Sequence, residues 1–555
     1  MSDKQKNLFV FCFSGLVIFV FYYLHFKYTT NIPIFDDYDA VIYFLSSFAD
    51  TNTFSGKLMW IVTQHREHRY IFPRIFLLIY HYIFGEINFK VIIFIGHIAL
   101  LGTFILIIQA INFKNLIRDN LNRALIIVSV TLLFFNIQYW EGSTWAIASF
   151  FFYFGMMFSF ISLYLLAKKN GSFVWAMIFA ILAAGTSGNG LLVFIIGALL
   201  LYFRKGFSKE FFYWLAAAAI IYFLYFWNYV SPADQTPVSV VLFQKPLKLI
   251  LFYLSYIGSV FRQIPGVGNA VSILSGAAAI ALLIFLILKK YYRSNPAIFG
   301  FILFLFLTML TSSLARVDVG FISRYVIFST LLIICFCISI IETYSERIYK
   351  FILLLFLLLS LSFNIYSFIF NFDDLKKMKG IITEGAILAK AGDYSLLIYP
   401  DSANVKSILQ NGISKNIYRL PDFNYENFLS DIDLTSKPLT ADITNTFNNF
   451  VDTKEFIYVN GWVNLIDEAT NNNLRIYLVL KSEKNLFALN TSTIRKKELR
   501  AENNQRVTDN SSYSLALLKN HMNIPPGIYE LGFYIGKDKN IGKYSYIITD
   551  KKINF

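Results

Sequence analysis

Long runs of apolar residues constrain this chain more than any other feature of its sequence. Eleven such runs lie within residues 1–371, and most of them approach or exceed the ~18 residues that a helix needs to cross a bilayer. Backbone groups in lipid must be hydrogen-bonded within their own segment, which leaves the helix as the structure for such runs. The sequence therefore predicts an α-helical polytopic membrane bundle. The expected spans are 8–26, 88–111, 121–138, 146–167, 172–187, 190–203, 210–229, 270–288, 296–314, 325–343 and 350–371.

Two further apolar stretches, 70–84 and 247–263, leave the number of crossings between eleven and thirteen. Cytoplasmic loops are enriched in Lys and Arg, so the basic residues of the other loops can decide between the two counts. Three loops between the expected spans together contain eight Lys and Arg residues. If the chain crosses eleven times, all eight are cytoplasmic; if it crosses thirteen times, all eight face outward. We therefore expect eleven crossings, a cytoplasmic N-terminus and an exported segment 372–555. The three basic loops are 112–123, 168–171 and 204–209.

The charge distribution separates the apolar part of the chain from the rest. Residues 1–371 hold 26 Lys and Arg against 14 Asp and Glu, whereas residues 372–555 hold 23 against 21. A basic excess in the apolar part is what loop charges that fix membrane orientation produce. No nucleic-acid-binding motif accompanies it, so we expect no nucleic-acid partner.

All three cysteines lie in apolar runs, which excludes a disulfide or a cysteine metal site from the polar tail.

The polar tail is expected to form a separate exported part. Residues 372–454 read as a mixed α/β connecting region, with a short helix over 374–390 and a strand in "YSLLIYP". From 455 to 555, apolar and polar residues alternate in short runs that Asn, Gly and Pro interrupt. This pattern is typical of an antiparallel β-sandwich. The sandwich is expected to be either a structural cap or a glycan-binding domain.

Three aspartates follow the first expected span directly. The stretch "NIPIFDDYDA" contains Asp36, Asp37 and Asp39. Neighbouring carboxylates near a low-dielectric region repel one another, which raises at least one pKa and suits a general base. The alternative is a solvated loop that caps a helix.

Asp37 and Asp39 also form a metal-binding D-x-D pattern, but the soluble α/β domain that uses this pattern is not visible in the sequence. We therefore expect no metal cofactor, with a divalent ion as the alternative.

The sequence "HREHR" lies later in the same external loop, 27–87. Its two histidines are three residues apart, and without an H-E-x-x-H pattern this spacing is a weak indication of zinc. Guanidinium groups match phosphate oxygens, so Arg66 and Arg69 are expected to bind a phosphate. His65, Glu67 and His68 are expected on the sugar or acceptor side, together with Asp39 from the start of the loop. The alternative is that the loop only anchors at the membrane interface.

Further polar residues are expected on the same external face. Two arginines and a tyrosine flank the outer ends of two spans, where they serve either as phosphate ligands or as interfacial anchors. Two tryptophans and a glutamate in "QYWEGSTW" suit stacking on a sugar ring, although Trp is also common at interfaces. An asparagine in "GTSGNG" belongs either to the acceptor site or to a tight turn. These residues are Arg316, Arg324 and Tyr325; Trp140, Glu141 and Trp145; and Asn189.

The order of these features resembles the GT-C superfamily of membrane glycosyltransferases. More closely, "FDDYD", "HREHRYIFPR", "YWEGSTWAIASF", "GTSGNGLLVF" and "SRY" resemble bacterial serotype-converting O-antigen glucosyltransferases over about residues 1–370. The resemblance implies an undecaprenyl-phosphate-linked sugar donor and an inverting transfer at the periplasmic face of the inner membrane. It maps the catalytic aspartate of the superfamily onto Asp36 or Asp37. The C-terminal sandwich is not a general feature of that superfamily.

With this resemblance, the expected function is transfer of a sugar to an O-antigen-like polysaccharide of the lipopolysaccharide type. Membrane lipids are expected partners, and a donor-synthesising glycosyltransferase and a flippase are further candidates. A polysaccharide polymerase and a non-enzymatic transporter of lipid-linked glycans are the alternatives. A transporter should bury ionisable groups at mid-membrane, whereas the charges here fall at the ends of spans. The sugar, its linkage, the acceptor and the oligomeric state do not follow from the sequence.

The loop charges generate a prediction about topology. A reporter that is active only outside the cytoplasm should be active when fused after residue 234 or 555 and inactive when fused after residue 120 or 206, because the basic loops stay inside. Reporter activity in intact cells is the measurement. Activity of the fusion at 120 or 206 would contradict the eleven-span arrangement.

Overall fold

A computed structural model gives the structure of this chain, and it divides the chain into two compact units. It describes residues 3–113, 120–169, 171–232, 235–344, 346–423, 443–465, 474–494, 512–537 and 544–555. The first unit comprises residues 1–29, 36–375 and 411–418, and the second comprises residues 30–35, 376–410 and 419–555. Each unit is described by itself.

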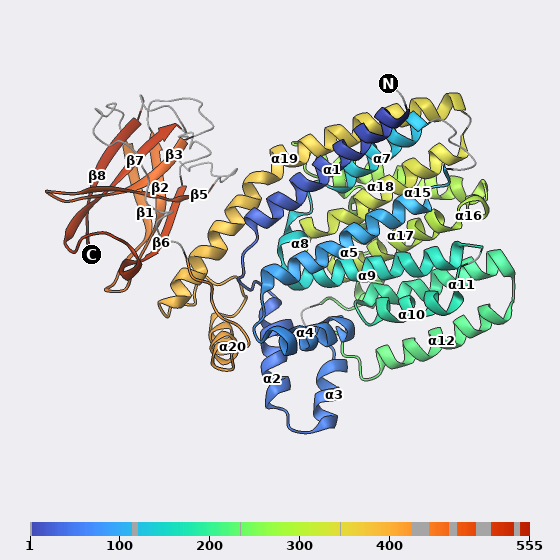
Figure 1. Cartoon of the computed structure of the whole chain (residues 1–555), viewed down its shortest axis with the longest axis horizontal. Coiled ribbons are helices and arrows are strands. Elements are labelled where there is room, and N and C mark those ends of the chain that lie inside the picture. The colour runs from blue at the N-terminus through green and yellow to red at the C-terminus, as the bar shows by residue number, and fades with distance from the viewer. Residues whose placement is uncertain are drawn as a thin grey trace. The chain divides into compact units, whose positions relative to one another are not determined.

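The first unit is a bundle of helices, and several long ones run alongside one another (Figure 1). Its α-helices are α1 (Asp3–Tyr28), α2 (Phe44–Asp50), α3 (Phe54–Val62), α4 (Ile71–Phe84), α5 (Phe89–Ala110), α7 (Asn120–Phe134), α8 (Trp140–Thr144), α9 (Ala146–Ala167), α10 (Phe173–Ala184), α11 (Leu192–Lys205), α12 (Lys209–Phe226), α13 (Val238–Gln244), α14 (Pro246–Ile257), α15 (Gly268–Leu288), α16 (Tyr291–Ser294), α17 (Pro296–Arg316) and α18 (Val326–Thr343). A last helix, α19 (Glu346–Lys390), belongs to this unit up to residue 375 and to the second unit from residue 376. One π-helix, η1 (Tyr38–Tyr43), and three short 3₁₀ helices, η2 (Gly188–Leu191), η3 (Ser259–Phe261) and η4 (Ser323–Tyr325), connect them.

The structure contains apolar helices of the length that the sequence predicts for membrane spans. Within the described residues, nine helices are long and apolar enough to cross a bilayer. The spans expected at 121–138 and 172–187 appear as the shorter apolar helices α7 and α10, so nine of the eleven expected spans reach full length. The undecided stretch 70–84 forms the short helix α4. The other undecided stretch belongs to a helix pair, α13 and α14, that is bent by 103° at Lys245, as in a broken span or a re-entrant loop.

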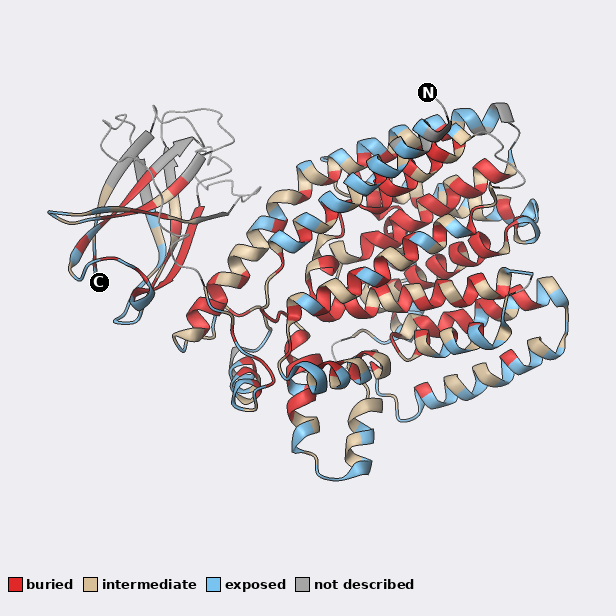
Figure 2. Cartoon of the chain, viewed as in Figure 1, coloured by how far each residue is buried: buried red, intermediate tan, exposed pale blue. Residues whose placement is uncertain are grey.

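Helices α9, α17 and α18 are mostly buried in this bundle, whereas α1, α12 and α15 have few buried residues. The exposed residues of α1 and α12 are visible in Figure 2. In α18, 78% of the apolar stretch is buried, against 11% in α12. Close approach of helices depends on small residues. A Cβ atom on Gly96 of α5 would lie 2.8 Å from the backbone of Ser149 in α9. The mostly exposed apolar surface of α12 is what a helix in contact with lipid presents.

A buried carboxylate joins three helices at the end of the bundle where α5 and α18 end and α17 begins. Glu342 accepts hydrogen bonds from the Tyr291 hydroxyl at 2.6 Å, from the Asn295 side chain at 3.0 Å and from the Asn112 backbone N–H at 2.8 Å. Asn295 also donates to the Ala110 carbonyl at 2.9 Å. A buried polar group is tolerated only when it is hydrogen-bonded, and this network meets that condition.

The second unit contains the sheet region that the sequence predicts. Two four-stranded antiparallel sheets have the strand orders β1-β2-β6-β5 and β4-β3-β7-β8. Alternate residues of their strands, among them Val459, Leu478, Leu515 and Phe533, form one apolar core. The strands are β1 (Ile443–Asp452), β2 (Phe456–Leu465), β3 (Leu474–Lys481), β4 (Leu486–Asn490), β5 (Ser492–Ile494), β6 (Ser512–Leu518), β7 (Ile528–Lys537) and β8 (Tyr544–Asn554); a helix, α20 (Ser402–Ser414), precedes them, and a 3₁₀ turn, η6 (Lys519–His521), follows β6.

Three details of the connecting region differ from the sequence-based expectation. The expected span 350–371 and the expected short helix 374–390 are one continuous helix, α19, because no helix-breaking residue separates them. The stretch 394–400, expected as a strand, forms turns and bends, because its backbone forms local hydrogen bonds, from Leu397 to Tyr394 at 3.2 Å and from Tyr399 to Leu397 at 2.9 Å. The first strand, β1, lies before the expected start at 455; its many Asn and Thr residues obscure the alternation.

The Glu342 network generates a prediction about stability. Glu342→Leu should lower the thermal unfolding temperature of the detergent-purified protein, because the Tyr291 hydroxyl and the Asn112 N–H lose their acceptor and each buried unpaired group costs about 1–3 kcal/mol. Glu342→Gln retains one acceptor oxygen and should cause a smaller loss. Equal unfolding temperatures for the Leu variant and the wild type would show that the network does not stabilise the bundle.

Candidate functional site

The aspartate segment lies at a constrained corner of the backbone. Phe35 has a φ of +48°, a left-handed conformation that a bulky residue rarely adopts. Asp36 and Asp37 follow it, and the π-helix η1 begins at the next residue. Backbone strain and π-helical turns both occur frequently at functional sites. The local structure therefore holds the two aspartates in fixed positions between the loop after α1 and the start of η1.

The two neighbouring aspartates have different surroundings. Asp37 is buried, and its Oδ1 accepts a hydrogen bond of 2.8 Å from the backbone N–H of Ile147 in the first turn of α9. A carboxylate there satisfies an unpaired N–H group and complements the positive end of the helix dipole. Asp36 is partly exposed, and its carboxylate has no hydrogen bond or ion pair with any residue in the described ranges. Of the two, Asp36 is the one available for chemistry.

Charged groups from distant parts of the chain surround Asp36. Burial raises the pKa of Asp36 above its usual value, and the nearby Glu67 acts in the same direction. The guanidinium groups of Arg66, Arg324 and Arg316 oppose this shift but do not cancel it. A carboxyl group with a raised pKa beside three cations combines a proton acceptor with a site for an anion.

Glu67 connects two of these arginines. Its Oε1 lies 3.2 Å from Nη2 of Arg316, and its Oε2 lies 3.8 Å from Nε of Arg66. The Nε2 atom of His68 lies 3.9 Å from Oε1 of the same carboxylate. Arg316 is the last residue of α17, some 250 residues from Glu67. The ion pairs therefore attach the "HREHR" turn to the end of a central helix.

The "HREHR" sequence forms a tight hairpin turn. His65 and His68 exchange two backbone hydrogen bonds of 2.8 and 2.9 Å, and Arg66 adopts a φ of +49° at the tip. The backbone N–H of Gly188 donates to Nδ1 of His68 at 3.2 Å, which brings the "GTSGNG" loop to the same place. Burial lowers the pKa of both histidines, that of His65 to about 4. The two imidazoles are therefore neutral at pH 7.

A second ion pair holds Arg324. Its Nη1 lies 2.6 Å from Oε1 of Glu141, whose other oxygen accepts a hydrogen bond of 2.6 Å from the Ser323 hydroxyl. The guanidinium group lies over the rings of Trp145 and Tyr325, with 4.8 and 5.2 Å to their centroids. These contacts fix the plane of the guanidinium while the carboxylate engages only one of its nitrogens. Arg324 is thus held in place with donor capacity left over.

Arg69 lies apart from this cluster. Sequence reasoning grouped it with the phosphate ligands, but its Nε and Nη1 donate to the carbonyls of Tyr225 and Val62 at 2.6 and 2.7 Å. Its Nη2 donates to the carbonyl of Trp227. Arg69 therefore joins the end of α12 to the end of α3, and its guanidinium is occupied by backbone.

The other expected site residues lie around the cluster, and two tyrosines that sequence reasoning missed join them. The Tyr225 hydroxyl donates to the Glu67 carbonyl at 3.3 Å. Burial, followed by the charges of Asp36 and Glu67, raises the pKa of Tyr70, whose ring packs against both histidines. Trp140 begins α8, Asp39 lies in η1, and Asn189 lies in η2, where it accepts a hydrogen bond from Ser187. Tyr70 directly follows "HREHR", but in a chain with 35 tyrosines its position carries no signal.

Metal ligands are not gathered at this cluster. In the ranges that the structure describes, no group of three or more His, Cys, Asp or Glu side chains is arranged to hold a metal ion. The D-x-D pattern of Asp37 and Asp39 does not form such a group, because Asp37 points to the start of α9.

Comparison of the chain with protein-family models, with curated proteins and with solved structures finds no match. The function is therefore inferred from the chemistry of the cluster.

The different surroundings of the two aspartates generate a prediction. Asp37→Ala should lower the stability of the purified protein by about 1–2 kcal/mol, because the first turn of α9 loses a charge-assisted hydrogen bond. Asp36→Ala removes no hydrogen bond to the described residues and should leave the thermal unfolding temperature within about 1 °C of the wild type. Unfolding curves of both variants in the same detergent are the measurement. An equal loss in both would contradict the separate roles.

Proposed function

We propose that this chain is a GT-C-type membrane glycosyltransferase that transfers a sugar from a polyprenyl-phosphate donor to a surface polysaccharide of the O-antigen type. The observation that carries the proposal is Asp36, a carboxylate with a raised pKa and no ion pair in the described residues, beside Arg66, Arg316 and Arg324. A glycosyl transfer from a phosphate requires a base for the acceptor hydroxyl and cations for the leaving phosphate. The cluster offers both, and the motif resemblance to serotype-converting glucosyltransferases supports the same reaction class.

Asp36 is the general base in this mechanism. The oxygen of an acceptor hydroxyl attacks the anomeric carbon of the donor sugar from the face opposite the phosphate, which inverts that carbon. The hydroxyl proton passes to the Asp36 carboxylate as the new glycosidic bond forms. The bond between the anomeric carbon and the phosphate oxygen breaks, and its electron pair leaves with the polyprenyl phosphate. No additional reactant is required, and the leaving phosphate needs no strong general acid.

The arginines act on the leaving phosphate. Negative charge develops on its bridging oxygen as the bond breaks, and fixed guanidinium groups stabilise that charge without reorganising. Arg316 and Arg324 are held by Glu67 and Glu141 and by the ring of Tyr325 between them. We assign the phosphate to Arg66, Arg316 and Arg324 and leave Arg69 out, because backbone carbonyls occupy it.

The position of the cluster suits a lipid donor. Arg316 ends α17 and η4, which contains Arg324, leads into α18, so both lie at the ends of membrane helices. A lipid-linked phosphate lies at the same headgroup level, while the acceptor polysaccharide approaches from water. The predicted topology places this end of the helices on the periplasmic side of the inner membrane.

The proposal predicts a specific effect of one substitution. Asp36→Asn should reduce transfer of sugar from polyprenyl phosphate by at least about a hundredfold, the usual scale for loss of a general base. Because burial raises the pKa of Asp36, the wild-type rate should fall with decreasing pH at a midpoint above ~3.9, where an ordinary aspartate ionises. The measurement is transfer by purified protein in lipid vesicles as a function of pH.

Glu210→Gln is the control, since it removes a partly exposed carboxylate from the first turn of α12, at the other end of that helix from Tyr225. It should retain transfer within a few fold.

The length of the product distinguishes this reaction from that of a polymerase, because a polymerase joins whole repeat units rather than single sugars. Near-normal transfer by Asp36→Asn would place the base elsewhere.

A further inference from the structure

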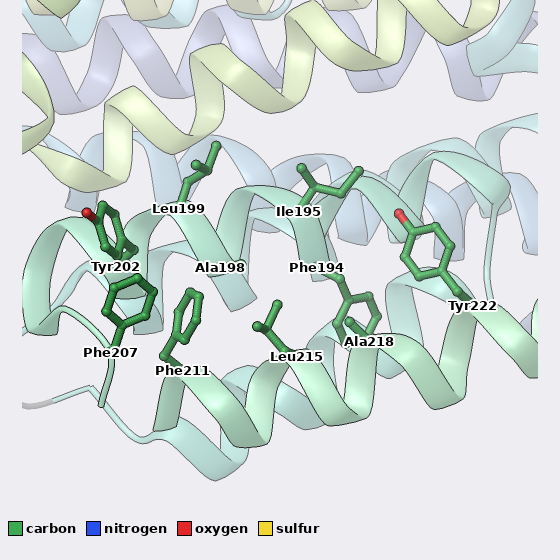
Figure 3. A pocket seen from close by; sticks show the side chains of 10 residues that line it. All are labelled: Phe194, Ile195, Ala198, Leu199, Tyr202, Phe207, Phe211, Leu215, Ala218 and Tyr222. Carbon is green, nitrogen blue, oxygen red and sulfur yellow. The ribbon is translucent and has the colours of Figure 1, made fainter. Parts of the chain in front are cut away.

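An apolar groove of about 510 Å³ lies between α11 and α12 (Figure 3). The ten residues that line it are all apolar or aromatic, and the hydroxyl groups of two tyrosines are their only polar side-chain atoms. One of these hydroxyls, that of Tyr222, donates to the Leu191 carbonyl at 3.1 Å. A groove of this composition receives hydrocarbon and not a sugar or an ion. The lining residues are Phe194, Ile195, Ala198, Leu199, Tyr202, Phe207, Phe211, Leu215, Ala218 and Tyr222.

The length of the groove distinguishes between kinds of hydrocarbon. From Phe211 to Tyr222, the lining residues of α12 extend over ~17 Å at 1.5 Å per residue, and Phe207 extends the groove further at the α11–α12 loop. One leaflet of a bilayer contributes only ~15 Å of hydrocarbon, half of the ~30 Å core. The groove is therefore longer than the hydrocarbon of one leaflet is thick, so its full length suits a long chain.

One end of the groove adjoins the candidate site. Tyr222, at that end, lies one turn before Tyr225 on α12, and the Tyr225 hydroxyl donates to the carbonyl of Glu67 at 3.3 Å. Leu191, which accepts the hydrogen bond of Tyr222, belongs to η2, and Gly188 of η2 donates to His68. A molecule in the groove thus has its end next to the turn that contains Arg66 and Glu67.

We propose that this groove binds the polyprenyl chain of the lipid-linked donor, with the phosphate of that donor at the arginine cluster. The inference rests on the proposed function and adds the location and the length of the lipid chain. A long branched apolar chain matches the lining, the length and the direction of the groove. Selectivity for the donor over phospholipids then comes from the length of its chain as well as from its headgroup.

Filling the groove tests this assignment. Ala218→Phe and Ala198→Phe place a ring in it from α12 and from α11, respectively. Each variant should bind undecaprenyl phosphate at least about tenfold more weakly than the wild type, since exclusion of only two methylene groups from an apolar site has this effect. Binding of geranyl phosphate, whose chain is too short to fill the groove, should weaken much less and shows that the headgroup site is intact. Ala216→Phe, on the exposed side of α12 away from the groove, is the matched control and should bind both ligands as the wild type does.

Three outcomes would overturn the assignment. The first is equal affinity of the wild type for undecaprenyl phosphate and geranyl phosphate, and the second is unchanged binding of undecaprenyl phosphate by both groove variants. The third is displacement of undecaprenyl phosphate by an equal amount of phosphatidylglycerol, which would make the groove a site for ordinary membrane lipid. In all three, the wild type still binds the polyprenyl phosphate, so the proposed function survives. Failure of the wild type to bind either polyprenyl phosphate would overturn both proposals.

Discussion

Pairing of partly buried charges at the ends of membrane helices is the interaction on which the candidate site depends. A charged side chain beside hydrocarbon is costly unless an opposite charge or hydrogen bonds compensate it. Glu67 and Glu141 supply that compensation to Arg316 and Arg324, and each pair joins segments that are more than 180 residues apart in the chain. The "HREHR" turn, the short helix α8 and the loop between α17 and α18 are therefore fixed relative to one another by electrostatics as much as by apolar packing.

The same pairing explains why Asp36 differs from the other acidic groups of the site. Glu67 and Glu141 form ion pairs, and Asp37 binds the first turn of α9, so each of these carboxylates has a fixed role. Asp36 lies within the field of the three arginines without such a contact among the described residues. Burial then dominates its pKa, and the carboxylate retains the capacity to accept a proton. Carboxylates that are ion-paired or hydrogen-bonded thus surround the Asp36 carboxylate, which is the reactive group in this account.

The sequence predicts much of this arrangement, because membrane burial imposes strong patterns. Apolar runs identify the helices, and period-two alternation identifies strands β2, β3, β6, β7 and β8. The sequence does not distinguish Asp36 from Asp37, because adjacent residues share the same local sequence. What separates them is the contact of Asp37 with Ile147, 110 residues away in the chain. For the same reason Arg69 resembles Arg66 in sequence, although its guanidinium is bound by distant carbonyls. Tyr70 is not predicted as a site residue, because in a chain with 35 tyrosines an aromatic residue at the start of an apolar helix is common.

The composition of the surface glycan tests the central claim most directly. It should be compared in cells that contain the wild-type protein, the Asp36→Asn variant at the same membrane level, or neither. Glycosyl transfer by this chain predicts one additional sugar with the wild type, and the same glycan in the variant cells as in the cells without the protein. An unchanged glycan in all three, or full modification by the variant, would contradict the account.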